Sequence, residues 1–302
     1  MPKPASPDKL TSDTPVTLAA GLLIALQSKT VWQCRKAVEA GKVEEGVHDM
    51  RVAAKRLRET LRIFKPVLPK AGKRCIADVD ELNDALGHVR DRDVLMINVR
   101  ALAAEVPADC TSLQALLERL AAEREPQFCA LKMAVADHMD ARKTPAEIRA
   151  LSKRLRSVSG KGASLRVAEF AHGAIYQRLI PVFNDNVAAK RPRNTAEFHA
   201  LRVKVKRLKY AVEPFLRTLP AGMAPLYQQL AELQELMGIV HDDDVLIATI
   251  KAFVAETKPK PDLRLALTHL RDLRKERHAH AVELLTQMED ADFPRQLMDL
   301  LD

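Results

Sequence analysis

Glycine and aromatic residues are scarce in this chain, which argues against a strand-rich fold. The 302 residues include 10 glycines, and Phe, Trp and Tyr together make up 4% of the sequence. Strands are enriched in aromatic and β-branched side chains, but no run of such residues lies between tight turns here. Alanine and leucine dominate the apolar residues instead, and both favour helices. The composition predicts an all-α fold.

Cysteine is also scarce, and its four positions follow no known framework. Cys34, Cys75, Cys110 and Cys129 form no C-x-x-C pair. Zinc sites and disulfide scaffolds use closely and regularly spaced cysteines. We therefore expect four reduced thiols in helix cores of a cytoplasmic protein.

No hydrophobic run is long enough to cross a membrane. The most apolar stretch, Val16 to Leu26, has 11 residues, whereas a spanning helix needs about 20. No small-residue cleavage site follows it, so it does not resemble a signal peptide. We interpret it as part of a first helix and expect no membrane partner.

One basic stretch occurs twice. VHDMRVAAKRLRETLRIF at 47–64 returns as FHALRVKVKRLKYAVEPF at 198–215, and an offset of 151 residues makes seven of the 17 positions from His48 to Phe64 identical. Chance gives about one identity at this composition. The same offset aligns LGHVRDRDVL at 86–95 with MGIVHDDDVL at 237–246. Two motifs in one register predict an internal duplication.

Apolar residues recur at spacings of three and four, which predicts amphipathic helices throughout. The expected ranges are 16–40, 44–66, 70–88, 91–105 and 111–138, then 164–188, 195–218, 222–239, 242–257 and 262–289. Pro214 is expected to bend its helix. We predict two four-helix-bundle subdomains related by a pseudo-twofold axis, at 16–142 and 143–302 within one domain at 16–302, with a flexible Pro-rich tail at 1–15.

The repeated basic residues fall on one face of each helix when drawn at 100° per residue, opposite an apolar face. A basic face alone is usually a solvated surface, but its recurrence in diverged surroundings favours a binding face. The predicted anion-binding residues are His48, Arg51, Lys55, Arg58 and Arg62 with His199, Arg202, Lys206 and Lys209; Arg56 and Arg207 point away from the face and rank second.

The second repeated motif has two interpretations. Gly87 and Gly238 suit helix ends, and Asp91 or Asp93, like Asp242 or Asp244, suits the N-cap of a following helix. Alternatively, the run from His241 to Asp244 could bind a metal with His48 or His88. Consecutive residues seldom point at one ion, and no His-x-x-x-His pair supports them. We favour the caps and expect no metal and no cofactor.

The net charge of +8 is consistent with an anionic partner. Binders of single-stranded nucleic acid usually stack bases on aromatic side chains, which are few here. A polyanion without bases, such as inorganic polyphosphate, fits better. No P-loop or nucleophile elbow is present, so we expect a binding protein rather than an enzyme. Nucleic-acid binding and, less favoured, a metal-dependent phosphohydrolase stay open as alternatives.

The doubled motifs VHDMRVAAKRLR with LGHVRDRDVL, and FHALRVKVKRLKYAVE with LMGIVHDDDVL, resemble the CHAD (conserved histidine α-helical domain) family. The resemblance covers the chain from about residue 16. It implies two four-helix subdomains around a basic surface that binds inorganic polyphosphate, contacts through the residues named above, and a place in the cytoplasm at polyphosphate granules. Many relatives carry a triphosphate tunnel domain, which we do not find here.

Overall fold

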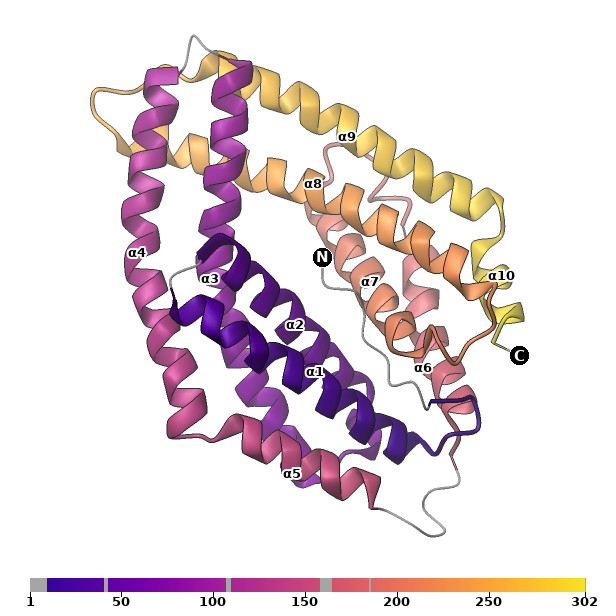
Figure 1. Ribbon diagram of the computed structural model, residues 1–302. Helices are drawn as coiled ribbons and strands as arrows, with labels where there is room; N and C mark the ends of the chain where they lie inside the picture. The colour runs from indigo at the N-terminus through magenta and orange to yellow at the C-terminus, as the bar shows by residue number, and fades with distance from the viewer. Residues whose placement is uncertain (1–9, 41–42, 107–109, 158–164, 185, 302) are drawn as a thin grey trace.

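The computed structural model describes residues 10–40, 43–106, 110–157, 165–184 and 186–301 (Figure 1). It confirms the all-α class, because the residues it describes form helices and no strand. The first five helices are α1 (Val16–Glu39), α2 (Val43–Ile63), α3 (Lys70–Glu105), α4 (Cys110–Asp140) and α5 (Thr144–Arg156). The next five are α6 (Val167–Phe183), α7 (Thr195–Val212), α8 (Met223–Glu256), α9 (Arg264–Asp290) and α10 (Phe293–Asp299).

Two predicted helix breaks are wrong. Residues 70–88 and 91–105 form one helix, α3, and residues 222–239 and 242–257 form α8, also without interruption. Gly87 and Gly238 therefore lie inside helices, and Asp91, Asp93, Asp242 and Asp244 cap nothing. Glycine weakens a helix by about 1 kcal/mol relative to alanine but does not end it.

The predicted bend at Pro214 is a helix end. α7 stops at Val212, and a short 3₁₀ segment, η4 (Glu213–Phe215), follows it. Another 3₁₀ segment, η1 (Lys65–Val67), follows α2 and also contains a proline. Proline lacks the N–H that an α-helix interior requires, which favours an end at both places, although α4 and α6 continue past Pro126 and Pro181.

The first helical bundle contains α5 as well as α1 to α4. α1 packs against α2 and α5, and α3 packs against α4 and α2. The Ser152 hydroxyl donates to the Gly21 carbonyl at 2.7 Å and attaches α5 to α1. A boundary at residue 142 therefore separates α5 from the helices it packs against. Leu10 and Thr14, within the expected tail, are buried, whereas residues 1–9 lie outside the described residues.

Three phenylalanines join the two bundles where α2 and α7 end. The rings of Phe64 and Phe215 lie 5.8 Å apart edge to face, and Phe170 on α6 stacks on Phe64 at 5.2 Å. Phe64 and Phe215 are the pair that the 151-residue offset superimposes. The Arg56 Nε donates to Glu213 Oε1 at 2.5 Å in the same region. This contact fixes α2 beside α7. The duplication itself stays a prediction.

A second apolar core lies at the far ends of the long helices. Leucines of α3 and α4, among them Leu102 and Leu116, pack there with residues of α8 and α9 such as Ile250 and Leu270. Figure 1 shows the helical hairpins α3–α4 and α8–α9 meeting at this end. The two bundles thus touch at two separate places.

The cysteines differ from the expectation. Cys75 is buried and Cys34 half-buried, but Cys110 and Cys129 are exposed, so two of the four are not core thiols; all four are free. Within the described part of the chain, no helix is both long and apolar enough to cross a bilayer.

Candidate anion-binding surface on α2 and α7

Helices α2 and α7 each bury one face and leave a basic face beside the other helix. On α2, Met50, Leu57 and Leu61 are almost fully buried, whereas Arg51, Lys55 and Arg58 are half-buried. On α7, Leu201, Val205 and Leu208 are buried, and Arg202 and Lys206 are half-buried. The apolar spacing of three and four sets this orientation. α2 packs against α7 (Figure 1). The charge of Lys206 acts on Lys55 across this contact, so the two basic faces lie near each other.

Lys55 and Lys206 come together from the two helices. Burial, followed by the charges of Arg51 and Lys206, lowers the pKa of Lys55 to about 7. Burial and the charges of Arg202 and Arg58 lower the pKa of Lys206 as well. Neither amine has an ion pair or hydrogen bond with another described residue. Asp91 and Glu59 offset only part of this effect, since the pKa of both amines stays lowered. Two half-buried amines that repel each other are unfavourable until an anion arrives.

Arg51 is held in place by α3. Its Nη1 donates to the Gly87 carbonyl at 2.8 Å and lies 3.0 Å from Asp91 Oδ1. A Cβ atom at residue 87 would lie 3.3 Å from that nitrogen, so glycine leaves room for the guanidinium. This approach explains a glycine inside a helix at this position.

Arg202 is the counterpart of Arg51 but makes fewer bonds. Its Nε is buried without a hydrogen-bond partner in the described chain. Burial lowers the pKa of Arg202, while the carboxylate of Asp242 opposes that shift. Burial in turn raises the pKa of Asp242, against the effect of Arg202. Arg202 is thus a cation with free donors beside a poorly solvated carboxyl group.

The two histidines have different neighbours. A ring nitrogen of His199 lies 3.1 Å from Nδ1 of His241, and the rings meet edge to face. Burial and the charge of Arg202 lower the pKa of His241 to about 4, and burial lowers the pKa of His199. Arg90 is the residue that the 151-residue offset aligns with His241, and it lies near His48. Burial, followed by the charge of Arg90, lowers the pKa of His48. Both predicted histidines are therefore neutral near pH 7.

His48 and His199 do not lie in the first helical turn. α2 begins at Val43 and α7 at Thr195, which places both histidines beyond the four N–H groups that lack helical partners. Their backbones therefore add no free donors for an anion.

Four of the predicted cations are engaged elsewhere. Arg58 Nη2 lies 3.0 Å from Glu59, Arg62 lies 2.8 Å from Asp80, and Arg56 is paired with Glu213. Lys209 donates to Gln234 at 3.0 Å, and burial lowers its pKa. Arg207 is exposed on α7. The structure therefore brings together Arg51, Lys55, Arg202 and Lys206, and places the other predicted residues around them.

The aspartates after the glycines pair with arginines of α4 and α9. Asp93 lies 2.6 Å from Arg124, and Arg274 bonds Asp244 with Nε at 2.9 Å and Nη2 at 3.2 Å. Asp243 lies 2.6 Å from Arg277. Sequence reasoning missed Arg124, Arg274 and Arg277, because each lies in a stretch with no repeated motif. It also missed Arg90, which lies within the second repeated motif but is replaced by His241 in the other copy. In the described residues, no group of three or more His, Cys, Asp or Glu side chains is placed to hold a metal ion.

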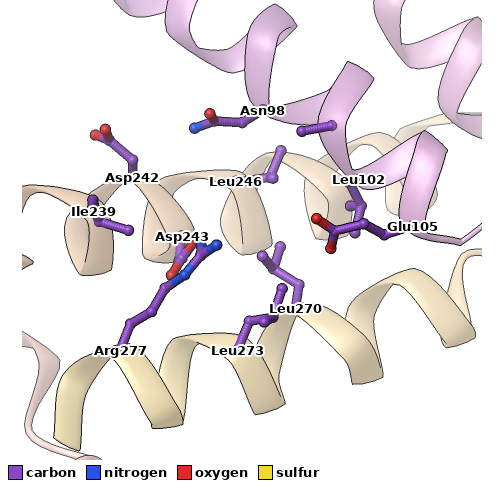
Figure 2. Close-up of a pocket in the computed structure, with 11 residues that line it drawn as sticks. Asn98, Leu102, Glu105, Ile239, Asp242, Asp243, Leu246, Leu270, Leu273 and Arg277 are labelled. Atoms are coloured by element: carbon purple, nitrogen blue, oxygen red, sulfur yellow. Dashed lines mark hydrogen bonds and ion pairs between the residues drawn. The ribbon is translucent and has the colours of Figure 1, made fainter. Parts of the chain in front are cut away.

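A pocket of about 290 Å³ lies next to the surface, between α3, α8 and α9. Figure 2 shows Asp242 above α8, on the side of Asn98, and Asp243 below it, directed at Arg277. The neighbouring aspartates thus point to different sides, as 100° per residue requires. Of these two aspartates, Asp242 faces the cations of α2 and α7, since the charges of Arg202 and Lys55 act on it together with that of Arg90 of α3.

These features define an all-α protein whose two bundles bring basic helices together. The CHAD domain model matches residues 23–251, and the chain belongs to the CHAD family. A search of the curated proteins found no match. The fold is similar to the crystal structure of the CHAD domain from the plant Ricinus communis, with 23% identity, 93% of this chain and 89% of that chain covered, and a TM-score of 0.60. It is also similar to PptA from Streptomyces chartreusis, with 16% identity, 92% and 100% covered, and a TM-score of 0.66.

Proposed function

We propose that this protein binds inorganic polyphosphate through the surface formed by Arg51, Lys55, Arg202 and Lys206, without catalysing a reaction on it. The observation that carries the proposal is the convergence of Lys55 and Lys206, two amines whose pKa values are lowered and which have no partner among the described residues. A polyanion placed between them removes the repulsion and restores favourable charge pairing. Membership of the CHAD family supports the same ligand.

The residues on the surface suit a chain of phosphates better than a nucleic acid. Phe64, Phe170 and Phe215 pack against one another in the core, and the ring of Tyr210 is only partly accessible. Among the described residues, no open aromatic platform therefore accompanies the four cations. Single-stranded nucleic acids gain much of their affinity from such stacking. Arginine donates two parallel hydrogen bonds to phosphate oxygens, and lysine adds a point charge. Binding in the cytoplasm at polyphosphate granules follows from this proposal.

The test is a gel-retardation titration with long-chain polyphosphate, with single-stranded DNA of equal charge as competitor. The variant carries Arg202→Glu and Lys206→Glu. Its control carries Arg271→Glu and Lys275→Glu, two exposed cations on α9 whose reversal changes the net charge equally. We expect the first variant to lose at least a hundredfold in affinity and the control to lose little.

Two outcomes would contradict the proposal. Equal losses in both variants would show that net charge alone drives binding. DNA that competes as well as polyphosphate would favour a nucleic-acid-binding protein. Affinity for polyphosphate should also fall steeply with salt, because each phosphate contact releases counterions.

A further inference from the structure

A larger cavity lies in the first bundle, between the ends of α1 and α4 and the start of α5. Its volume is about 700 Å³, within the range of small-molecule sites. Its apolar lining includes Trp32, Met139 and Pro145. These residues belong neither to the basic surface on α2 and α7 nor to the repeated motifs, so the cavity needs an explanation of its own.

Three cations line the same cavity, and none of the described residues that line it is acidic. Lys29 and Lys36 come from α1, and Arg149 comes from α5. All three are exposed, and none has an ion pair with another residue that the structure describes. Charged side chains next to an apolar cavity without counter-ions are complementary to an anion that also has an apolar part.

The spacing of the cations indicates a ligand with more than one negative charge. Lys29 and Lys36 are seven residues apart, which places their Cα atoms about 10.5 Å apart along the helix axis. Trp32 lies between them on the same helical face. One carboxylate cannot balance the charges of Lys29, Lys36 and Arg149 together, and a bare phosphate chain has no apolar group to place against Trp32 and Met139. The lining therefore fits a ring system with several phosphates.

The indole of Trp32 supplies a second observation. Its Nε1 is buried without a hydrogen-bond partner in the described chain. A buried donor left unpaired is unfavourable, and such groups are few in folded proteins. At the wall of a cavity, a small movement of the indole would let a heteroatom of a bound ring accept this hydrogen bond.

The cationic lining is not repeated at the positions 151 residues further along. Lys29 and Trp32 correspond there to Ile180 and Phe183 of α6, and Lys36 corresponds to Val187, beyond the end of that helix. Arg149 corresponds to Leu300. The three cations of this cavity therefore stand outside the repeated basic motif.

We propose that this cavity binds a nucleoside di- or triphosphate, with the ring in the apolar part and the phosphates at Lys29, Lys36 and Arg149. The site is separate from the basic surface on α2 and α7 and does not depend on polyphosphate binding. It gives the protein a place for a second, small ligand.

Trp32 is the single tryptophan of the chain, so its fluorescence reports on this cavity. The experiment titrates ADP, adenosine and pyrophosphate into the full chain, by tryptophan fluorescence and by isothermal titration calorimetry. We expect saturable binding of ADP with a change in fluorescence, and at least tenfold weaker binding of adenosine and of pyrophosphate. No saturable binding of ADP would overturn the proposal, and so would pyrophosphate binding as tight as ADP.

Two variants locate the site. Combined replacement of Lys29, Lys36 and Arg149 by alanine should weaken ADP binding at least tenfold with unchanged helical circular dichroism, because all three side chains are exposed. The Arg202→Glu, Lys206→Glu variant should bind ADP as the wild type does. The reverse result, with loss only in the second variant, would place the nucleotide on the α2 and α7 surface and contradict the proposal.

Discussion

Lys55 of α2 and Lys206 of α7 lie close enough across the contact between the bundles for the charge of Lys206 to lower the pKa of Lys55. Burial is the larger cause, and together with Arg51 and Lys206 it brings that pKa to about 7. The amine is therefore about half protonated at neutral pH in the ligand-free protein. This relationship couples anion binding to pH and to stability.

The affinity for polyphosphate should fall as the pH rises above 7. A bound polyanion favours the charged amine and returns the pKa of Lys55 toward its ordinary value, so binding takes up a proton between about pH 7 and 10. Uptake of one proton lowers the affinity up to about tenfold per pH unit in that range. Calorimetry at pH 8 in buffers of different ionisation enthalpy measures the uptake directly.

The control for this pH dependence is Lys55→Arg. Arginine stays charged throughout the range, so the variant should bind at pH 9 nearly as tightly as at pH 7. A pH dependence unchanged by the substitution would assign the proton to another group, such as Lys206 or Lys209, whose pKa values burial also lowers.

Lys55→Met should stabilise the ligand-free protein while weakening polyphosphate binding. The folded pKa of Lys55 lies below its unfolded value of 10.5, so the folded state carries an unfavourable charge below about pH 7, and this cost disappears as the pH rises toward 10.5. Methionine removes the charge and fills similar space. At pH 6 we expect a gain on the order of 1 kcal/mol in the free energy of unfolding. Urea denaturation at pH 6 and pH 10 measures it, and an equal gain at both values would contradict the explanation.

Asp242→Asn should tighten polyphosphate binding several-fold. The carboxyl group of Asp242 faces Arg202, Arg90 and Lys55, so it competes with an incoming phosphate for the same donors. Asparagine keeps the shape and removes the charge. The matched control is Asp272→Asn, at an exposed position of α9. Weaker binding in the Asp242 variant would show instead that this carboxylate holds Arg202 in its binding position.

Gly87 and Gly238 should respond differently to alanine. A Cβ atom at Gly238 meets nothing within 4 Å, so Gly238→Ala should raise the free energy of unfolding by about 1 kcal/mol, the usual difference in helix propensity. At Gly87 the same atom lies 3.3 Å from Nη1 of Arg51. The gain in the free energy of unfolding should therefore be smaller for Gly87→Ala. The added methyl group should also move the Arg51 guanidinium away from the Gly87 carbonyl. Thermal unfolding compares the two, and weaker polyphosphate binding is expected only for Gly87→Ala.

The sequence predicted the helical class and most helix positions because apolar spacing is a local signal. The prediction of helix ends was wrong at Gly87 and Gly238, because a glycine followed by aspartates is a pattern typical of helix ends. Distant residues engage these positions instead: Arg51 occupies the space at Gly87, Asp93 of α3 pairs with Arg124 of α4, and Asp244 of α8 pairs with Arg274 of α9. Local pattern carries no information about such partners.

The candidate site was predicted in part. The repeated register identified Arg51, Lys55, Arg202 and Lys206, which meet between the bundles. It also included Arg58 and Arg62, whose charges Glu59 and Asp80 balance, because a helical wheel shows which face a residue occupies but not which acid lies opposite. His241 beside His199 follows from the packing of α8 on α7.

The second apolar core has a consequence for how a ligand would be recognised. The phenylalanines pack the two bundles together at the ends of α2 and α7, and the apolar residues of the long helices pack them together again at the far ends. Two bundles in contact at two distant places resist hinge motion, since opening would expose apolar side chains at one of the two contacts. The distance between the basic helices is then fixed, and an anion that binds there would be selected by its width and flexibility rather than by closure of the protein around it.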